Sequence, residues 1–132
     1  MNFVDTGVFF ALHLKNDQYH DVALRQWRRH GRVAMTSNHV LDEFATGLAR
    51  RAGYRFAADR VAHIYAASTI EVVQSTLEDE LEALRTMRKY ADQGITFTDC
   101  ISFAIMKRRR IRAAFTFDRH FTIAGFAVVG LG

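Results

Sequence analysis

The sequence contains no proline, only one cysteine and no apolar run long enough to cross a membrane. The lone cysteine, Cys100, excludes a disulfide framework and is typical of proteins from a reducing compartment. The apolar residues 3–12 have no basic residue before them and include Asp5, and they fall well short of the ~20 residues that span a bilayer. We therefore predict a cytoplasmic protein with no membrane segment and no secretory leader.

Lysine is scarce as well: the chain has 15 arginines but only 3 lysines. In total 18 basic and 14 acidic residues give a net charge of +4. Guanidinium groups suit bidentate phosphate recognition, so nucleic acid is a candidate partner. With 49% apolar and 24% charged residues the composition excludes a disordered or fibrous chain. A length of 132 residues predicts one domain spanning 1–132.

Without proline, the element boundaries have to be predicted from hydrophobic periodicity and capping residues. The predicted strands are 2–4, 33–35, 70–73, 113–117 and 126–129. The predicted helices are 7–31 with a break near 16–17, 38–52, 54–67, 76–90 and 98–107. Strands that alternate with helices predict a parallel sheet with right-handed crossovers and helices on both faces.

One predicted helix has a particularly clear hydrophobic period. Leu77, Leu81, Leu84 and Met87 recur at three- and four-residue steps, which makes the predicted helix 76–90 amphipathic.

Four acidic residues are predicted to lie at one edge of the sheet. Asp5 and Asp118 directly follow predicted strands, whereas Asp99 and Glu43 lie at or near the starts of helices. Ligands of open α/β sheets bind beyond the carboxyl ends of the strands, and crossover helices begin at that edge. Unpaired, these carboxylates would repel one another and raise one another's pKa values. A divalent cation such as Mg²⁺ or Mn²⁺ resolves this repulsion.

Each acidic residue also has a simpler structural explanation. Asp5 and Asp118 are equally well explained as turn residues that bond the local backbone. Asp99 is favoured by the dipole at a helix start, and Glu43 fits a solvated helical face. On spacing alone, the neighbouring Asp42 competes with Glu43 for the site.

A family resemblance rests on four sequence blocks that follow one another along the whole chain. The blocks are Val4-Asp5-Thr6, Val40-Leu41-Asp42-Glu43, Thr98-Asp99-Cys100-Ile101-Ser102-Phe103-Ala104, and Thr116-Phe117-Asp118-Arg119-His120-Phe121 followed by Gly125-Phe126. In these blocks the chain resembles the PIN-domain nucleases, and most closely the VapC toxins of bacterial and archaeal toxin–antitoxin pairs. One departure is Gly7, where serine or asparagine often stands in the family.

The resemblance implies a three-layer α/β/α sandwich with a central, mainly parallel sheet. It implies a metal-dependent endoribonuclease that hydrolyses RNA phosphodiester bonds with Mg²⁺ or Mn²⁺ held by Asp5, Asp99 and Asp118. Glu43, which the family pattern favours over Asp42, would act as a ligand through water or orient the attacking water. The implied partners are an RNA substrate, a cognate antitoxin and a second copy of the chain in a homodimer. Two alternatives stay open: a PIN nuclease of RNA processing, and a non-catalytic RNA- or protein-binding module.

Further residues are expected around these carboxylates. The hydroxyls of Thr6 and Thr116 are candidates for fixing them, although capping of the strand edge explains both equally well. Arg119, next to Asp118, is the candidate for direct RNA contact. His120 is a candidate general acid, but in an Arg-His-Phe turn we expect it to be a structural hydrogen-bonding residue. A second basic group lies at the end of the predicted helix 98–107, roughly 15 Å from the metal site. Contact with flanking RNA phosphates and stabilisation of the helix C-terminus explain this group equally well. It consists of Lys107, Arg108, Arg109, Arg110 and Arg112.

Overall fold

The computed structural model describes residues 1–30 and 33–130. The strands are β1 (Asn2–Val4), β2 (Ala34–Ser37), β3 (Ile70–Val73), β4 (Ala113–Phe115) and β5 (Ala127–Val129). The helices are α1 (Thr6–His13), α2 (His20–His30), α3 (Asn38–Ala52), α4 (Tyr54–Ala66), α5 (Leu77–Lys89), α6 (Phe97–Arg108) and α7 (His120–Ile123). A short 3-10 turn, η1 (Ala91–Gln93), follows α5. None of the described helices is long and apolar enough to cross a bilayer.

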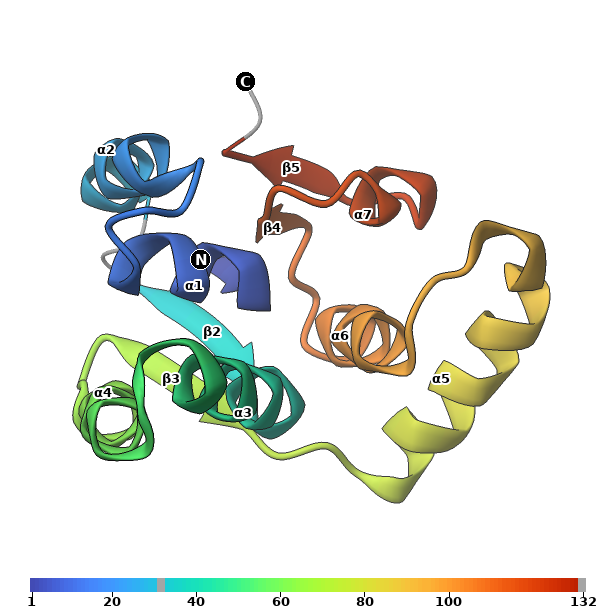
Figure 1. Ribbon diagram of the computed structural model, residues 1–132. Helices are drawn as coiled ribbons and strands as arrows, with labels where there is room; N and C mark the ends of the chain where they lie inside the picture. The colour runs from blue at the N-terminus through green and yellow to red at the C-terminus, as the bar shows by residue number, and fades with distance from the viewer. Residues whose placement is uncertain (31–32, 131–132) are drawn as a thin grey trace.

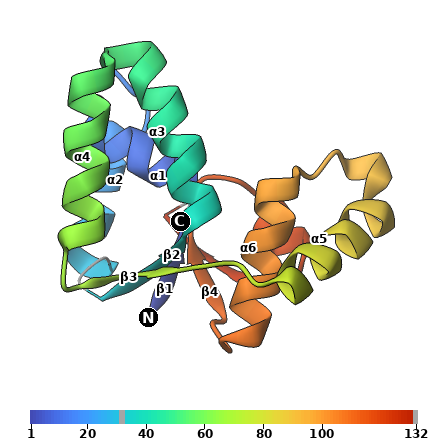
Figure 2. The same ribbon diagram turned by 90° about the horizontal axis from the view of Figure 1, so that it is seen from below.

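The strands form one five-stranded sheet in the order β3-β2-β1-β4-β5, with every neighbouring pair parallel. Helices α1 to α4 cover one face, and α5, α6 and α7 cover the other (Figures 1 and 2). This arrangement confirms the predicted three-layer α/β/α sandwich. The chain winds outward from β1 to β3 and then crosses to β4 on the other side of β1. The strand order therefore reverses between β1 and β4, which is where open α/β sheets bind their ligands.

The central strands are apolar because helices cover them on both sides. Phe3 and Val4 of β1 and Ala114 and Phe115 of β4 are completely buried. The register sets Phe3 beside Ala114 and Val4 beside Phe115. This pairing fixes the points at which the two strands end, and thus the positions of the acidic residues that follow them.

The predicted elements are present, but several boundaries near the acidic residues differ. The break in the predicted helix 7–31 separates α1 from α2, and its last residue, Gly31, lies outside the described residues. Helix α6 is capped by Thr96, not by Thr98, because the Thr96 hydroxyl accepts a hydrogen bond from the backbone N–H of Asp99 at 3.2 Å. Strand β2 runs two residues further than predicted, to Ser37.

The segment around Asp118 also differs from the prediction. Strand β4 ends at Phe115, not at Phe117, so Asp118 follows the strand after a short turn. Helix α7, only four residues long, was not predicted, because a single helical turn leaves too little periodicity to recognise.

Helix α5 is held on α6 by one buried carboxylate. Asp79 accepts hydrogen bonds from Nε and Nη2 of Arg108 at 3.0 and 2.8 Å, and it also closes a capping box with Thr76. Burial pushes the pKa of Asp79 up, but the bonds from Arg108 and from the Thr76 backbone outweigh this and hold the pKa below 3.8. Leu77, Leu81 and Leu84 of the same helix point outward and are 67%, 41% and 46% exposed.

We expect Asp79→Ala to lower the free energy of unfolding by about 2–3 kcal/mol, because it removes both a charged hydrogen-bonded pair and a helix cap. The matched control is Glu82→Ala, which breaks the exposed pair with Arg85 on the same helix and should change the stability by less than about 0.5 kcal/mol. Urea denaturation measures both variants. Because the pKa of Asp79 is lower in the folded state, the difference from wild type should be full above pH 4 or so and shrink as the pH falls through the folded pKa. Equal losses in the two variants would contradict this role for Asp79.

Candidate active site at the carboxyl edge of the sheet

A cleft opens where the strand order reverses, and the four predicted acidic residues line it. Asp5 follows β1, Glu43 comes from α3, Asp99 from the first turn of α6, and Asp118 from the turn after β4. Glu43 lies on the exposed rim, whereas its neighbour Asp42 does not line the cleft. Thr6, Gly7, Phe10, Thr96 and Phe117 complete the lining.

Asp5 lies at the bottom of the cleft, 6% exposed, and hydrogen bonds fix both of its oxygens. Oδ1 accepts from the backbone N–H of Thr6, and Oδ2 accepts from the hydroxyl of Thr116, each at 2.8 Å. The same Thr116 hydroxyl accepts from the backbone N–H of Asp118 at 2.9 Å. One threonine therefore links two of the carboxylate-bearing segments.

The hydroxyl of Thr6 was a candidate for fixing the carboxylates, but it does not bind Asp5. Its buried hydroxyl makes no hydrogen bond to any described residue, so the backbone of Thr6, not its hydroxyl, orients Asp5. The reason is that Thr6 is the first residue of α1, where the orphan N–H groups of a helix point at the preceding carboxylate.

Asp99, Asp118 and His120 form a tight group beside Asp5. One ligand atom of each lies within 4.8 Å of the other two. Nδ1 of His120 is 3.2 Å from Oδ1 of Asp118 and 3.9 Å from Oδ2 of Asp99. The backbone N–H of His120 also donates to Oδ1 of Asp118, which fixes that carboxylate at 2.8 Å.

Burial and mutual repulsion disturb the titration of these carboxyl groups. Burial, and to a lesser degree the charges of Asp118 and Glu43, raise the pKa of Asp5 to about 6 although its hydrogen bonds work against this. Burial, followed by the charges of Asp5 and Asp118, raises the pKa of Asp99 to about 9. Without a counter-charge the cleft therefore holds protons on carboxyl groups that would otherwise be ionised.

The donor set fits a hard divalent cation. Asp99 and Asp118 offer ligand atoms within 4.8 Å of one another and of His120, and Asp5 lines the same cleft. Carboxylate oxygens are the ligands that Mg²⁺ and Mn²⁺ prefer. The buried Nδ1 of His120 makes no hydrogen bond to any described residue, although it faces the same carboxylates. A cation would remove the repulsion that raises the pKa values of Asp5 and Asp99.

The four arginines that were predicted to bind RNA differ from one another in their contacts and backbone conformation. Arg108 is paired with Asp79, and Arg109 forms a two-pronged pair with Glu71 at 2.8 and 2.9 Å. Arg110 has a left-handed backbone (φ 57°) in the turn that ends α6. Arg119 is exposed and immediately precedes α7. Both pairs give Arg108 and Arg109 a structural role, and RNA contact by all four arginines stays a prediction.

Five residues at the site were not among the predicted site residues: Gly7, Phe10, Thr96, Phe117 and His120. His120 was expected to be structural; its spacing of two residues from Asp118 is the signal that it shares the site. Phe10 and Phe117 line the cleft, and Phe117 stacks on Tyr19 with ring centroids 4.4 Å apart. Nothing in the sequence separates these two rings from core aromatics, because they lie on apolar stretches of a helix and a strand end.

The fold and the cleft define a class: an α/β/α domain with a cluster of carboxylates at its topological switch point, typical of metal-dependent enzymes that act on phosphate esters. The chain belongs to the PIN domain family, whose model matches residues 3–127. The resemblance inferred from the sequence blocks is thereby confirmed.

Two relatives refine this classification. The chain is 39% identical over 129 residues to the 23S rRNA-specific endonuclease VapC20 of Mycobacterium tuberculosis, covering 98% of each chain. The crystal structure of that organism's VapC20, described as a sarcin-ricin loop cleaving toxin, matches with a TM-score of 0.90 at 37% identity over 96% of this chain and 97% of the other. A toxin–antitoxin complex from Klebsiella pneumoniae has a TM-score of 0.71 at 12% identity over 98% of this chain and 96% of the other, and it shows the fold alone.

The two threonines of the cleft provide a matched test of metal binding. Thr116→Val should weaken Mn²⁺ binding by about 10- to 100-fold, because Asp5 loses the hydroxyl that holds it and Asp118 loses its backbone anchor. Thr6→Val removes a hydroxyl without a partner and should change the affinity by less than about twofold. Isothermal titration calorimetry with Mn²⁺ measures both, with Asp118→Asn as a variant that lacks a ligand. Equal effects of the two threonine changes would contradict the role given to Thr116.

Proposed function

We propose that the protein is a divalent-metal-dependent endoribonuclease that cleaves ribosomal RNA and serves as the toxin of a toxin–antitoxin pair in the cytoplasm. The observation that carries this proposal is the convergence of Asp5, Glu43, Asp99 and Asp118 on one cleft. The relative at 39% identity over nearly the full length, an endonuclease specific for 23S rRNA, supports the substrate class.

In this proposal Asp5, Asp99 and Asp118 would hold Mg²⁺ or Mn²⁺, which would supply the positive charge that polarises the scissile phosphate and lowers the pKa of a water molecule. Thr116 and the N–H of Thr6 hold the Asp5 carboxylate in a fixed orientation, so no binding free energy is used to order it. Glu43, on the exposed rim, orients the attacking water and accepts its proton.

His120 positions Asp118 in this mechanism. Its backbone N–H donates to Oδ1 of Asp118, and Nδ1 of its ring lies 3.2 Å from the same oxygen. Phe10 and Phe117 add apolar surface to the lining of the cleft beside the carboxylates.

The decisive experiment is cleavage of a sarcin-ricin stem–loop RNA by the purified protein. We expect cleavage with Mg²⁺ or Mn²⁺, and a rate lower by at least 100-fold with a chelator or in Asp99→Asn. Asp42→Asn, which changes an exposed carboxylate outside the cleft, should cleave like wild type. Activity that survives in chelator or in Asp99→Asn would refute the metal mechanism.

Growth experiments separate the toxin from the two alternatives. Expression of the wild type should arrest growth, whereas expression of Asp99→Asn should not. RNA cleavage without growth arrest would favour a nuclease of RNA processing, and metal binding without cleavage of any RNA would favour a binding module.

The antitoxin is proposed to bind beside the N-terminal helices. An apolar pocket lies there, and its lining includes Phe9, Leu12, Leu24, Trp27 and Ile64 from α1, α2 and α4. Such a surface suits the apolar face of a helix or an extended segment from a partner protein.

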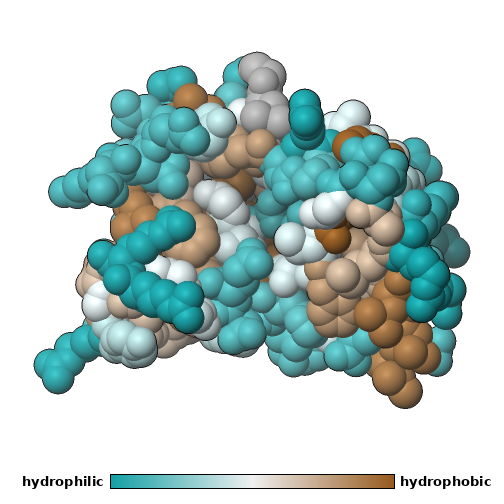
Figure 3. All heavy atoms as spheres, turned by 45° about the vertical axis from the view of Figure 1, so that its right-hand side comes forward, coloured by the Kyte–Doolittle hydropathy of each residue, from teal (hydrophilic) through white to brown (hydrophobic). Residues whose placement is uncertain are grey.

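We also propose that the protein forms a homodimer and that one face of α5 forms the interface. Leu77, Leu81 and Leu84 form an exposed stripe on α5, and Figure 3 shows an apolar patch at the lower right of the molecule, where α5 lies. The sequence pattern marked these leucines as one face of an amphipathic helix, and the described part of the chain leaves that face exposed. A second copy would bury it.

The dimer is tested with Leu77→Lys/Leu84→Lys, which should convert a dimer into a monomer because it places charges in an apolar interface. Tyr54→Lys, at a residue that is 78% exposed on α4, is the matched control and should stay dimeric. Light scattering after size-exclusion chromatography measures both. A wild type that is monomeric, or a double variant that remains dimeric, would contradict the proposed interface.

A further inference from the structure

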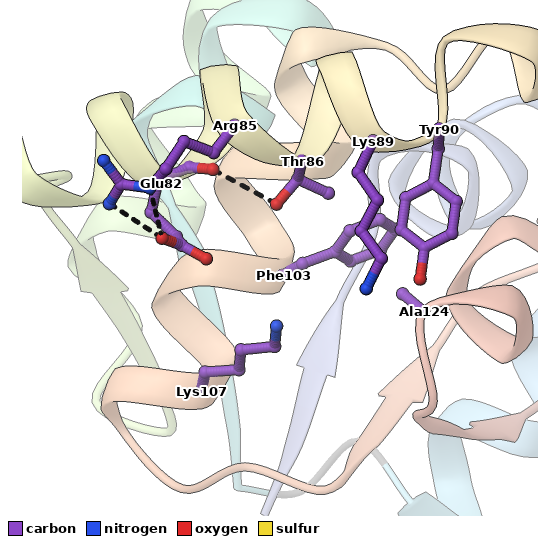
Figure 4. Close-up of a pocket in the computed structure, with 8 residues that line it drawn as sticks. All are labelled: Glu82, Arg85, Thr86, Lys89, Tyr90, Phe103, Lys107 and Ala124. Atoms are coloured by element: carbon purple, nitrogen blue, oxygen red, sulfur yellow. Dashed lines mark hydrogen bonds and ion pairs between the residues drawn. The ribbon is translucent and has the colours of Figure 1, made fainter.

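A second pocket lies on the other side of α6 from the sheet, between α5, α6 and the end of α7. Glu82, Arg85, Thr86, Lys89 and Tyr90 line it from α5 and its C-terminal end. Phe103 and Lys107 line it from α6, and Ala124 closes it after α7. In Figure 4 the ammonium groups of Lys89 and Lys107 point into the same space, with the Tyr90 hydroxyl beside it.

The charges of this pocket are not balanced. Glu82 is held by Arg85, whose Nε and Nη2 donate to it at 3.0 and 2.8 Å, so that pair is neutral. Among the described residues, neither Lys89 nor Lys107 forms an ion pair or a hydrogen bond through its side chain; Lys89 only lies over the Tyr90 ring at 5.3 Å. Two exposed positive charges therefore face a space floored by the apolar ring of Phe103, and an anion is the ligand whose charge complements them.

The ion pairs of the neighbouring arginines support the assignment of an anion to Lys107. The end of α6 was expected to supply RNA contacts, but Arg108 and Arg109 are committed to Asp79 and Glu71. Lys107 is the residue of that run that turns into a pocket, and it meets a second lysine there. The chain has only three lysines in all, and two of them converge on this one space.

The pocket is connected to the carboxylate cleft through two helices. Helix α6 carries Asp99 in its first turn and Lys107 eight residues later, which corresponds to about 12 Å of rise and about 80° of rotation. Helix α7 runs from His120 to the pocket wall at Ala124, and Phe121 fixes it on Phe103 of α6 with ring centroids 4.9 Å apart. A nucleic-acid strand has one phosphate per ~3.4 Å when stacked, so 12 Å corresponds to about three or four nucleotides.

We propose that Lys89 and Lys107 form a phosphate-binding subsite that holds the RNA backbone about three or four nucleotides from the scissile bond. This inference rests on the proposed ribonuclease function. Lysine suits the task because its compact, flexible ammonium group neutralises a phosphate without requiring one geometry. The Tyr90 hydroxyl is placed to donate to the same phosphate.

Binding is measured with a fluorescently labelled sarcin-ricin stem–loop and the Asp99→Asn protein, which binds without cleaving, over a series of salt concentrations. Adding Lys89→Ala/Lys107→Ala should weaken binding by about tenfold and reduce the slope of log K against log salt by about 1–2. Lys107→Arg, which keeps the charge, should bind like the parent protein.

Lys15→Ala is the matched control, because Lys15 is the third lysine and lies in the α1–α2 connection on the far side of the molecule (Figure 1). It should leave both affinity and salt slope unchanged within error. The proposal is overturned if the double variant binds like its parent, or if Lys15→Ala loses as much as the double variant does. The first result would show that the pocket takes no part in RNA binding, and the second would show a general effect of charge.

The experiment separates this inference from the proposed function. If the wild type cleaves the RNA but the lysine variants bind it normally, only the subsite fails. If the wild type does not cleave although binding depends on the two lysines, the nuclease proposal fails and the anion subsite stands. Thermal melts of Lys89→Ala/Lys107→Ala should match the wild type, because both lysines are exposed.

Discussion

The hydrogen bond from Thr116 to Asp5 connects residues from the two ends of the chain, and the rest of the site depends on it. It forms because β1 and β4 are paired in the middle of the sheet, at the point where the strand order reverses. Parallel strands end at a common edge, so this pairing brings Asp5 and Asp118 together, and α6 adds Asp99 from the side. The buried apolar strands thus provide the rigidity that holds like charges side by side.

This arrangement has an energetic cost that is informative about function. Carboxyl groups buried beside one another lower the stability of the fold, and the raised pKa values of Asp5 and Asp99 express that cost. A protein that needed only to bind phosphates would gain nothing from a negative cleft, since the cleft repels them. The carboxylates make chemical sense when a cation occupies the space between them, which is why the geometry favours a catalytic over a purely binding role.

The sequence predicted the fold well because its strands are apolar runs and its long helices carry clear periodicity. It placed the four acidic residues at one edge because strand ends and helix starts share that edge in any parallel sheet. It did not predict Thr96 as the cap of α6, nor helix α7, because both depend on one turn of backbone geometry. The ion pairs of Arg108 and Arg109 join residues that are 29 and 38 positions apart, and a charge run by itself does not reveal which cations already have partners.

Those ion pairs also change what the basic composition means. A run of five basic residues in six positions looks like one RNA-binding surface in the sequence, whereas the structure divides it by function. Arg108 and Arg109 attach the outer helix α5 and the edge strand β3 to α6, so they stabilise the layer that carries Asp99. Lys107 forms no ion pair with any described residue and faces a pocket together with Lys89. Arginine, with its planar fork, is used here for fixed pairs inside the fold, and lysine for a contact that a mobile polyanion has to form and release. At this end of the molecule, arginine therefore stabilises the fold and lysine is available for the RNA.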